Sequence, residues 1–281
     1  MIEVLKPGIL TSIQDKGRFD GLEFGIPVSG AMDQTSMQQA NMILGNKAGD
    51  AVLEMALLGP KLRFTSPTLI SVAGADMSPT VNGEVIEMLH PYPVISGDVL
   101  EFKSAAAGCR SYLAVKGGLT SEVILGSRSQ YDGITEASCL SKGAIIPYQS
   151  LDYLSFPSGS RLKMDRENFT REVLEVFPGP EFNGLSDDQK DKLFRTSFTI
   201  SHYNNRMAYQ LNEELENILS PIITAPVMPG TVQLTPSGKL IILMRDAQTT
   251  GGYPRILQLD ERAIDRLSQK YEGQFIRFKL Y

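Results

Sequence analysis

The stretch GPKLRFTSPTLISV, residues 59–72, contains two runs of strand-forming residues separated by a Thr-Ser-Pro turn. Residues 230–243, GTVQLTPSGKLIIL, repeat this order of strand, turn and strand in the second half of the chain. Val, Ile, Leu, Thr and Phe favour strands, whereas Pro and Gly favour the turns between them. The two stretches therefore predict a β structure whose elements recur along the chain.

Most other segments also favour strands. Short apolar runs interrupted by Gly or Pro are typical of strands joined by turns, and they occur as TLISVAGA, GDVLEF, RSYLAVKGG, VLEVFPGP, KLIILM and GQFIRFKL. Helical spacing of apolar residues is found after Asp33 up to Leu44, in LSDDQKDKLF near 185–194, and in DERAIDRLSQKY at 260–271. The sequence predicts a mainly β protein with a few short helices.

Comparison of the chain with itself extends the repeat. IEVLKPG near the start matches LEVFPGP, with Pro7 opposite Pro178, and GDVLEF matches GQFIRF, all at an offset of about 170 to 176 positions. The segment that begins at Asp33 falls opposite SHYNNRMAYQLN, with Met32 near Met207. These matches indicate an internal duplication into two β modules in tandem. The alternative is chance agreement among strand-and-turn sequences, which share a small set of residue types.

A polar, charged stretch, PSGSRLKMDRENFTRE at residues 157–172, precedes the second copy. Its composition is typical of a linker. We therefore expect a first module at residues 1–156, a linker at 157–170 and a second module at 171–281.

The composition excludes several classes of partner and site. The 281-residue chain has a formal net charge of -5, and we find no Lys/Arg cluster, so we expect no binding to nucleic acid or to an anionic membrane. A signal-like N-terminus and an apolar run of about 20 residues are both missing, which favours a cytoplasmic protein. Two cysteines, Cys109 and Cys139, and two histidines offer little for a metal site, and we expect none.

The first candidate site is the turn FGIPVSGAMD, residues 24–33. Asp33 suits a helix N-cap because its carboxylate can accept hydrogen bonds from N–H groups of the first turn. Pro27 fixes the entry, Gly30 lets backbone approach closely, and Ser29 offers a hydroxyl beside N–H groups of partial positive charge. The turn predicts a site for a carboxylate, carbamate or phosphate. The alternative is a purely structural turn between a strand and a helix.

The second candidate site is the stretch RDAQTTGGYPRI, residues 245–256, directly after the apolar run LIILM. A buried strand that ends in such a loop delivers many hydrogen-bonding groups to one place, and loops held by rigid strands often carry function. The candidate residues are Gln248, Thr249, Thr250, Gly251, Gly252 and Tyr253. The alternative is a Gly-Gly turn whose hydroxyls cap strand ends. The loop lacks the Gly-Lys-Ser/Thr end of a Walker A motif, so this chain has no motif for ATP.

Two further charged residues are candidates. Arg128 in LGSRSQYDGI offers a fork of donors that suits a carboxylate or a phosphate, although a surface Arg paired with an acid is the simpler explanation. Glu54 lies in the apolar run AVLEMALLGP, where a carboxylate needs a partner or an exposed edge.

The motifs together resemble a known family. SIQDKGR, GIPVSGAMD, ANMILGN, VLEMALLGP, GADM, SYLAVKGGL, LGSRS, NRMAYQL and DAQTTGGYP are similar, in that order, to motifs of the biotin-dependent carboxyltransferase-like proteins. This family includes the C subunit of 5-oxoprolinase, the second allophanate hydrolase subunit, the carboxyltransferase region of urea carboxylase and an antagonist of a sporulation-kinase inhibitor. The resemblance covers nearly the whole chain, and it implies two cyclophilin-like β-barrel modules.

The resemblance also implies an activity and partners. It indicates one component of an ATP-dependent 5-oxoprolinase complex, which converts 5-oxoproline to glutamate and also contains an A subunit and a paralogous B-type subunit. ATP would be a co-substrate of the complex, with its site on this chain or on a partner. The implied catalytic residues are Arg128, Gln248, Thr249 and Thr250, and the implied substrate-binding residues are Ser29, Gly30, Asp33, Glu54, Gly251, Gly252 and Tyr253. We expect these groups to converge on one pocket.

Two other functions fit the same family. The chain could be the carboxyltransferase component of a urea carboxylase or allophanate-type system, with biotin on another chain because a convincing biotin-attachment lysine is missing here. It could instead be a non-catalytic regulator that binds a kinase inhibitor similar to the B-type subunit, in which case the polar loops would form a protein interface.

Overall fold

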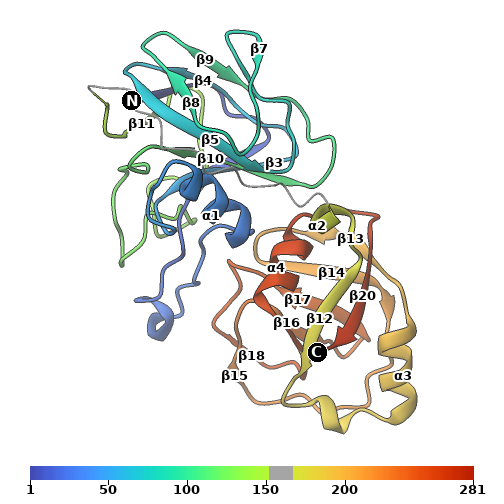
Figure 1. Cartoon of the computed structure of the whole chain (residues 1–281). Helices are drawn as coiled ribbons and strands as arrows, with labels where there is room; N and C mark the ends of the chain where they lie inside the picture. Colours follow the sequence, from blue (N-terminus) through green and yellow to red (C-terminus); the bar gives the residue numbers. More distant parts are fainter. Residues whose placement is uncertain (152–166) are drawn as a thin grey trace. The chain divides into compact units, whose positions relative to one another are not determined.

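The computed structural model describes residues 1–151 and 167–281, which form two compact units (Figure 1). Unit 1 comprises Met1–Phe19 and Ser29–Arg166, and unit 2 comprises Asp20–Val28 and Glu167–Tyr281. Most of the linker predicted at 157–170 lies outside the described residues, and its last four residues form helix α2 (Glu167–Thr170). The predicted domain boundaries stay a prediction.

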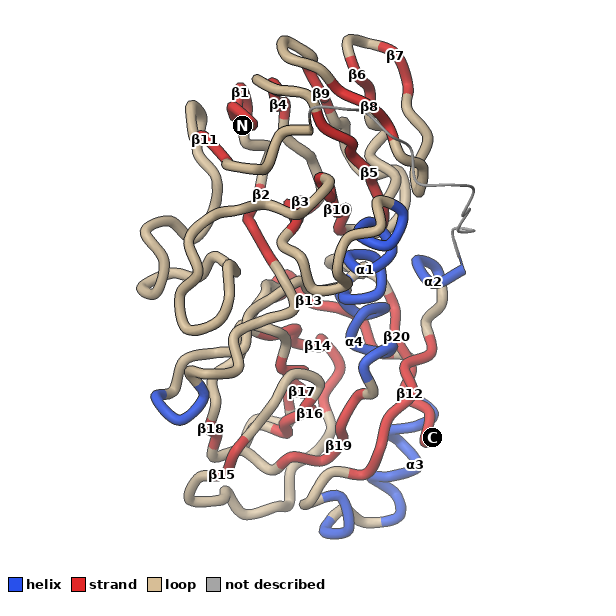
Figure 2. Tube along the Cα trace, turned by 60° about the vertical axis from the view of Figure 1, so that its left-hand side comes forward, coloured by secondary structure: helices blue, strands red, loops and turns tan. Residues whose placement is uncertain are grey.

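Unit 1 contains two β-sheets (Figure 2). The strands of the first sheet, in spatial order, are β11 (Ile145–Ile146), β1 (Ile2–Lys6), β4 (Lys61–Phe64), β9 (Val99–Glu101), β6 (Thr80–Val81) and β7 (Glu84–Val85). The strands of the second sheet are β2 (Leu10–Gln14), β3 (Val52–Ala56), β10 (Arg110–Val115), β5 (Thr68–Gly74) and β8 (Tyr92–Val94). All pairings in both sheets are antiparallel.

The core of unit 1 lies between these sheets. Leu62 and Phe64 of β4 and Leu53 and Leu113 of the second sheet belong to one buried cluster. Helix α1 (Gln34–Ile43) covers the opposite face of the second sheet, where it contacts β5 and β10. The central strands β3, β5 and β10 of the second sheet are thus buried on both faces, which explains their continuous apolar runs.

Unit 2 contains a closed seven-stranded barrel. In spatial order its strands are β12 (Val173–Pro178), β19 (Arg255–Leu259), β16 (Thr231–Leu234), β17 (Lys239–Leu243), β14 (Ala208–Glu214), β13 (Phe198–Asn204) and β20 (Phe275–Leu280). The parallel pair β12–β20 closes the ring, with Val173 opposite Arg277 and Val176 opposite Leu280. Closure leaves no unpaired sheet edge in this barrel.

Short elements surround the barrel. They are η1 (Leu22–Phe24), η2 (Phe182–Gly184), α3 (Asp187–Arg195), α4 (Glu261–Ser268) and the small pair β15 (Ala225–Pro226) and β18 (Thr250–Gly251). Ser186 and Gln189 form a capping box at the start of α3, and Asp260 caps α4. Each cap satisfies N–H groups that a helix leaves unpaired. Within the described residues, no helix is both long and apolar enough to cross a membrane.

The mainly β class with a few short helices and two β modules is confirmed. The three helices predicted from apolar spacing are present as α1, α3 and α4. Two segments that the predicted repeat aligns have different secondary structure. The segment after Asp33 is helix α1, whereas residues 201–212 lie in the hairpin β13–β14. In addition, β4 and β5 belong to different sheets, whereas β16 and β17 are neighbours. Strand-and-turn sequences share so few residue types that similar runs do not fix the pairing.

Candidate functional site

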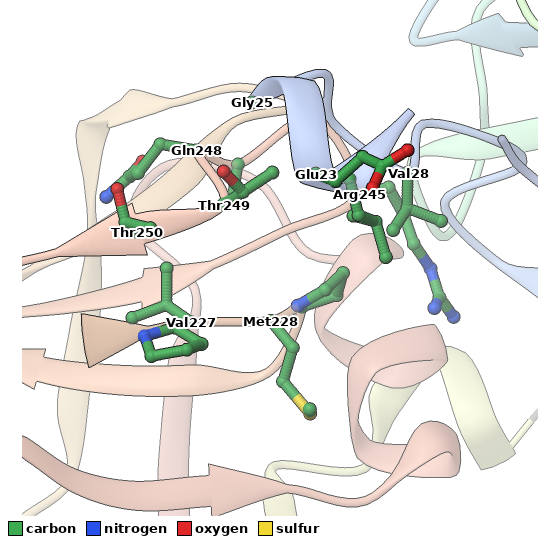
Figure 3. Close-up of a pocket in the computed structure, with 13 residues that line it drawn as sticks. Glu23, Gly25, Val28, Val227, Met228, Arg245, Gln248, Thr249 and Thr250 are labelled. Atoms are coloured by element: carbon green, nitrogen blue, oxygen red, sulfur yellow. The ribbon is translucent and has the colours of Figure 1, made fainter. Parts of the chain in front are cut away.

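Unit 2 contains a pocket of about 660 Å³ (Figure 3). Its walls come from the segment Asp20–Val28, which we call the strap, from residues 226–229, and from residues 245–250 after β17. Val227 and Met228 supply an apolar wall, and Gln248, Thr249 and Thr250 supply polar groups. Pockets of this size and composition are typical of small-molecule sites.

The polar wall is held by backbone hydrogen bonds. Thr250 pairs with Pro226 across β15 and β18, and Val227 N donates to Thr249 O at 3.0 Å. Among the described residues, the side chains of Gln248, Thr249 and Thr250 have no hydrogen-bond partner. Their hydroxyl and amide groups are therefore able to donate to a ligand and to accept from it.

The charges around this pocket are balanced by acids. Arg245 is 6% exposed and lies in the wall. Its Nη2 atom lies 2.7 Å from Glu261 Oε2 and 3.6 Å from Asp265 Oδ1, both on α4. Glu23 of the strap adds a further negative charge. The residues that line this pocket therefore do not fit the phosphates of ATP, which need an excess of positive charge.

The last three residues predicted in this loop do not line the pocket. A Cβ atom on Gly251 would lie 2.5 Å from Gln233 Nε2, and one on Gly252 would lie 3.2 Å from Ile222 O. Both glycines therefore allow close packing within the chain itself. Tyr253 is 41% exposed. Substrate binding by these three residues stays a prediction.

In unit 1, the loop that carries Arg128 is fixed by a buried carboxylate. Asp15 Oδ1 accepts from Ser127 Oγ at 2.7 Å and from Ser129 Oγ at 2.7 Å, and Asp15 Oδ2 accepts from Arg128 N at 2.7 Å. The Arg128 side chain is half-buried, and its guanidinium has no hydrogen bond or ion pair with the residues that the structure describes. The guanidinium is thus available to an anion, and anion binding by Arg128 stays a prediction.

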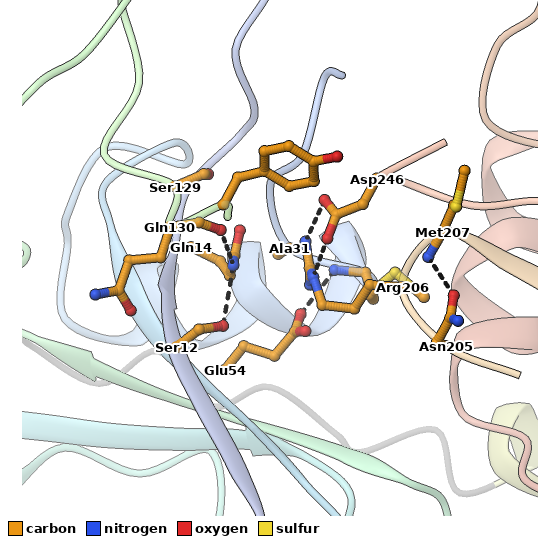
Figure 4. A network of polar contacts seen from close by, with 12 residues as sticks. Ser12, Gln14, Ala31, Glu54, Ser129, Gln130, Asn205, Arg206, Met207 and Asp246 are labelled. Atoms are coloured by element: carbon orange, nitrogen blue, oxygen red, sulfur yellow. Dashed lines mark hydrogen bonds and ion pairs between the residues drawn. The ribbon is translucent and has the colours of Figure 1, made fainter. Parts of the chain in front are cut away.

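A residue that precedes Asp15 strengthens the same anchor. Gln14 Nε2 donates to Ser12 Oγ at 2.9 Å and to Gln130 O at 3.2 Å (Figure 4). The sequence reasoning missed Asp15 as a site residue. The available signal was an acid directly after the strand-like run LTSIQ and two residues before a glycine.

The PVSG turn contacts the same anchor. Ala31 N donates to Asp15 O at 2.9 Å, and a Cβ atom on Gly30 (φ 85°) would lie 2.8 Å from Gly17 N. Ser29 is fully buried at φ 55°, and its hydroxyl lacks a partner among the described residues. The structure therefore brings the PVSG turn and the loop that carries Arg128 together at Asp15. Their convergence with Thr249 stays a prediction.

The N-terminus of α1 meets protein groups of unit 1. Asp33 caps the helix by accepting from Ser36 N at 2.9 Å. Glu54 Oε2 accepts from Met32 N at 2.7 Å and from the Tyr112 hydroxyl at 2.9 Å, and that hydroxyl accepts from Asp33 N at 2.8 Å. Burial, followed by the charge of Glu54, raises the pKa of Tyr112 well above its ordinary value.

Glu54 also has a cationic neighbour, because its Oε1 atom lies 3.7 Å from Arg110 Nε. A buried carboxylate that has both a cation and hydrogen-bond donors is stable without a ligand. Substrate binding by Ser29, Gly30, Asp33 and Glu54 stays a prediction. Among residues 1–151 and 167–281, no three His, Cys, Asp or Glu side chains gather closely enough to hold a metal ion.

The fold matches solved structures over nearly its whole length. A crystal structure of the protein TTHA0988 superposes with a TM-score of 0.88 at 29% identity, covering 99% of this chain and 55% of that one. The chain thus spans about half of that structure's chain. The crystal structure of the urea amidolyase of K. lactis superposes with a TM-score of 0.86 at 27% identity, covering 99% of this chain and 18% of that one.

The sequence comparisons agree with the fold. The chain is 30% identical over 288 residues to the C subunit of 5-oxoprolinase from Escherichia coli, covering 99% of this chain and 90% of that protein. The family model described as "Carboxyltransferase domain, subdomain A and B" matches residues 24–280. This chain therefore belongs to the family of carboxyltransferase domains with subdomains A and B.

Proposed function

We propose that this chain is the C subunit of an ATP-dependent 5-oxoprolinase complex that converts 5-oxoproline and water to glutamate. The observation that carries the proposal is the 30% identity to the C subunit of the Escherichia coli 5-oxoprolinase over 90% of that protein. We infer that the complex is cytoplasmic and includes an A subunit and a paralogous B-type subunit. The chain acts as part of a hydrolase and is inactive alone.

The roles of the residues follow from the groups they offer. Lactam opening requires an activated carbonyl, because water attacks an amide slowly, and phosphorylation of the amide oxygen by ATP would supply that activation. The lining of the unit 2 pocket does not suit ATP, so we assign the ATP site to another protein of the complex. Gln248, Thr249 and Thr250 would orient the lactam and stabilise the charge that develops on its oxygen.

The remaining predicted residues would serve the anionic end of the substrate. Arg128 has no partner for its guanidinium among the described residues, and we assign it to the carboxylate of 5-oxoproline. The turn at Ser29 and Gly30 and the cap at Asp33, supported by Glu54, would hold the surrounding backbone. Gly251, Gly252 and Tyr253 would shape the far end of the polar loop.

Reconstitution tests this function. The chain alone should produce no glutamate from 5-oxoproline and ATP, whereas the mixture with the A and B subunits should produce it. Arg128→Met and the double variant Thr249→Val/Thr250→Val should abolish turnover. Arg195→Met on the exposed face of α3 and Thr120→Val on an exposed loop are the matched controls. Near-normal rates in the Arg128 or threonine variants would refute the assigned roles.

A second function is favoured by the likeness to the urea amidolyase of K. lactis. In this case the chain would transfer a carboxyl group from biotin on another chain to a small amide. The apolar wall at Val227 and Met228 and the polar wall at Gln248 fit an uncharged ring, so the pocket suits either reaction. Avidin-sensitive, bicarbonate-dependent consumption of ATP would identify this reaction. Binding to a protein similar to the B subunit, without any turnover, would instead indicate a regulator.

A further inference from the structure

We infer that Asp246 is a positioning residue, which orients Gln248, Thr249 and Thr250 because Arg206 holds its carboxylate. This inference rests on the proposed role of those three side chains. Arg206 Nε donates to Asp246 Oδ2 at 2.7 Å, and Arg206 Nη2 donates to Asp246 Oδ1 at 3.1 Å (Figure 4). Two parallel hydrogen bonds from one guanidinium fix the direction of a carboxylate as well as its position.

The contact between these residues is reinforced and largely shielded from water. The side chains of Arg206 and Asp246 are both 11% exposed. Asp246 N also donates to Arg206 O at 2.9 Å, so the backbone and the side chain of Asp246 are tied to the same residue. Arg206 lies in the turn between β13 and β14, and both of these strands belong to the closed barrel. The loop is therefore attached to a rigid element at this point.

Asp246 lies immediately before the polar wall of the pocket. Ala247 N donates to Met244 O at 3.1 Å, and the next tie is the hydrogen bond from Val227 N to Thr249 O at 3.0 Å. Only Ala247 and Gln248 separate the Asp246 anchor from Thr249. A rotation at Asp246 is therefore passed on to the threonine hydroxyls, because so short a segment cannot absorb it.

The ion pair between Arg245 and Glu261 fixes Arg245, the residue before Asp246, but it does not fix the loop that follows Asp246. It joins the segment that follows β17 to α4, through the residue that precedes Asp246. Loss of the Arg206–Asp246 contact would leave Gln248 and Thr249 attached to the barrel through the backbone alone. The expected defect is misplaced donors, with the barrel still folded.

The test uses the Asp246→Asn variant in the reconstituted complex. Asn keeps the size of the side chain but has one acceptor oxygen and no charge, so the double contact is lost. We expect kcat to fall by about 10- to 100-fold while KM changes by less than about threefold, because donors aimed at the transition state are displaced. The matched control is Glu175→Gln, which breaks the partly buried Glu175–Arg266 pair of the same unit, away from the pocket.

The control separates positioning from a general loss of stability. Glu175→Gln should lower the melting temperature at least as much as Asp246→Asn but leave kcat within about twofold, since distant sites act independently. A wild-type kcat in Asp246→Asn, or an equal loss of kcat in both variants, would overturn the inference.

A second measurement works on the free chain and does not depend on the reaction. Hydrogen exchange of the Ala247 amide, which donates to Met244 O, should be at least about tenfold faster in Asp246→Asn than in the wild-type chain, because the loop opens more often. Unchanged exchange would overturn the inference even if the wild-type complex forms glutamate. If exchange is faster in the variant but the wild-type complex forms no glutamate, the proposed function is rejected and the inference that Asp246 anchors the loop still holds.

Discussion

At the residue scale, the polar groups of unit 1 are organised around buried carboxylates whose partners are distant in the sequence. Asp15 is 6% exposed and accepts hydrogen bonds from a loop more than a hundred residues away, through Ser127, Arg128 and Ser129. An ionised carboxylate is tolerated inside a protein only when donors surround it. Asp15 thus links the position of the loop at Arg128 to the stability of unit 1.

The Asp15→Ala variant tests this dependence. The change leaves the hydroxyls of Ser127 and Ser129 and the N–H groups of Gly17 and Arg128 without their acceptor. Each buried unsatisfied group costs about 1–3 kcal/mol, so we expect a loss of at least about 3 kcal/mol in the free energy of unfolding. Urea denaturation measures the loss.

Asp98→Ala is the matched control for that measurement. Asp98 accepts from Ile95 N and from Asn82 Nδ2 on the exposed surface, where water can replace it. Its loss should cost about 1 kcal/mol or less. Equal losses in the two variants would show that Asp15 contributes no more to the free energy of unfolding than an exposed acid does.

Tyr112 gives a prediction at alkaline pH. Burial raises its pKa in the folded protein, so the folded state keeps the hydroxyl proton at a pH where the unfolded chain has released it. The stability contribution is present below the unfolded pKa of about 10 and declines as the pH rises above that value. Tyr112→Phe should cost about 1–3 kcal/mol at neutral pH, because Asp33 N and Glu54 lose their partner.

The slope of stability with pH distinguishes this effect from a simple loss of packing. Above pH ~10 the Tyr112→Phe variant should lose stability less steeply than the wild-type protein, since it lacks the titrating group. Urea midpoints measured over a series of alkaline pH values provide the comparison. Parallel slopes would be inconsistent with a raised pKa at this hydroxyl.

At the element scale, ion pairs fasten the short elements to the barrel of unit 2. Glu181, just before η2, accepts from Arg255 Nη2 at 2.8 Å and from Arg255 N at 2.8 Å, and Arg255 begins β19. The hydrogen bond from the Arg255 side chain lowers the pKa of Glu181. The stability from this pair is therefore present above the unfolded pKa of about 4.3 and is lost as the pH falls through the lower, folded pKa.

Glu181→Gln should destabilise the protein by about 1 kcal/mol at neutral pH, since the pair is partly exposed. The difference from the wild-type protein should shrink as acid protonates Glu181. Thermal unfolding at neutral pH and in mild acid measures it, with Glu3→Gln on the exposed Arg63 pair as the control. A difference that stays constant into acid would contradict the lowered pKa.

The strap is the least securely attached element of the pocket. Its backbone hydrogen bonds are internal, from Phe24 N to Gly21 O, from Gly25 N to Leu22 O and from Ile26 N to Gly21 O. The described residues show no hydrogen bond between the strap and residues 167–281. Segments without such bonds open easily. The strap therefore depends on its own folded turn and on side-chain contacts.

Gly21→Ala tests the importance of that turn. A Cβ atom on Gly21 would lie 2.9 Å from the Cβ atom of Ile26, so the turn must open. We expect cleavage by chymotrypsin after Phe24, which is 70% exposed, to become several-fold faster. Gly49→Ala is the control, because its new methyl group would meet only the flexible Lys16 side chain at 3.2 Å. Unchanged cleavage in Gly21→Ala would show that the strap is held by other contacts.

The elements also show what local sequence determines. Asp33 caps α1, as its capping chemistry predicts, and each apolar run quoted as a strand forms one. Strand pairing was not predictable, because β4 and β5 are adjacent in sequence but belong to different sheets. The partners of Asp15 were also beyond local reasoning, since a hydrogen bond between distant segments leaves no pattern in a single sequence. Glu54 was identifiable because an acid inside an apolar run requires a partner.

At the scale of the whole molecule, neither unit is one continuous segment of the chain. All seven barrel strands of unit 2 lie within residues 173–280, yet one wall of the unit 2 pocket is the strap at residues 20–28. Composition indicates a linker near residue 157, but no local signal shows that an early turn belongs to the later module. A cut at the predicted boundary would thus preserve the barrel and remove part of the pocket.

The fragment of residues 167–281 tests this division. The fragment retains every strand of the closed barrel, so we expect cooperative thermal unfolding and a far-ultraviolet spectrum dominated by strands. Without the strap, the apolar wall at Val227 and Met228 is uncovered, and a dye that fluoresces on apolar surfaces should bind several-fold more strongly than to the full chain. Addition of a peptide of residues 20–28 should reduce this fluorescence, whereas a peptide of the same composition in scrambled order should not. If the fragment folds and binds the dye no more than the full chain does, the strap does not cover that wall, because an uncovered apolar surface must be accessible to the dye.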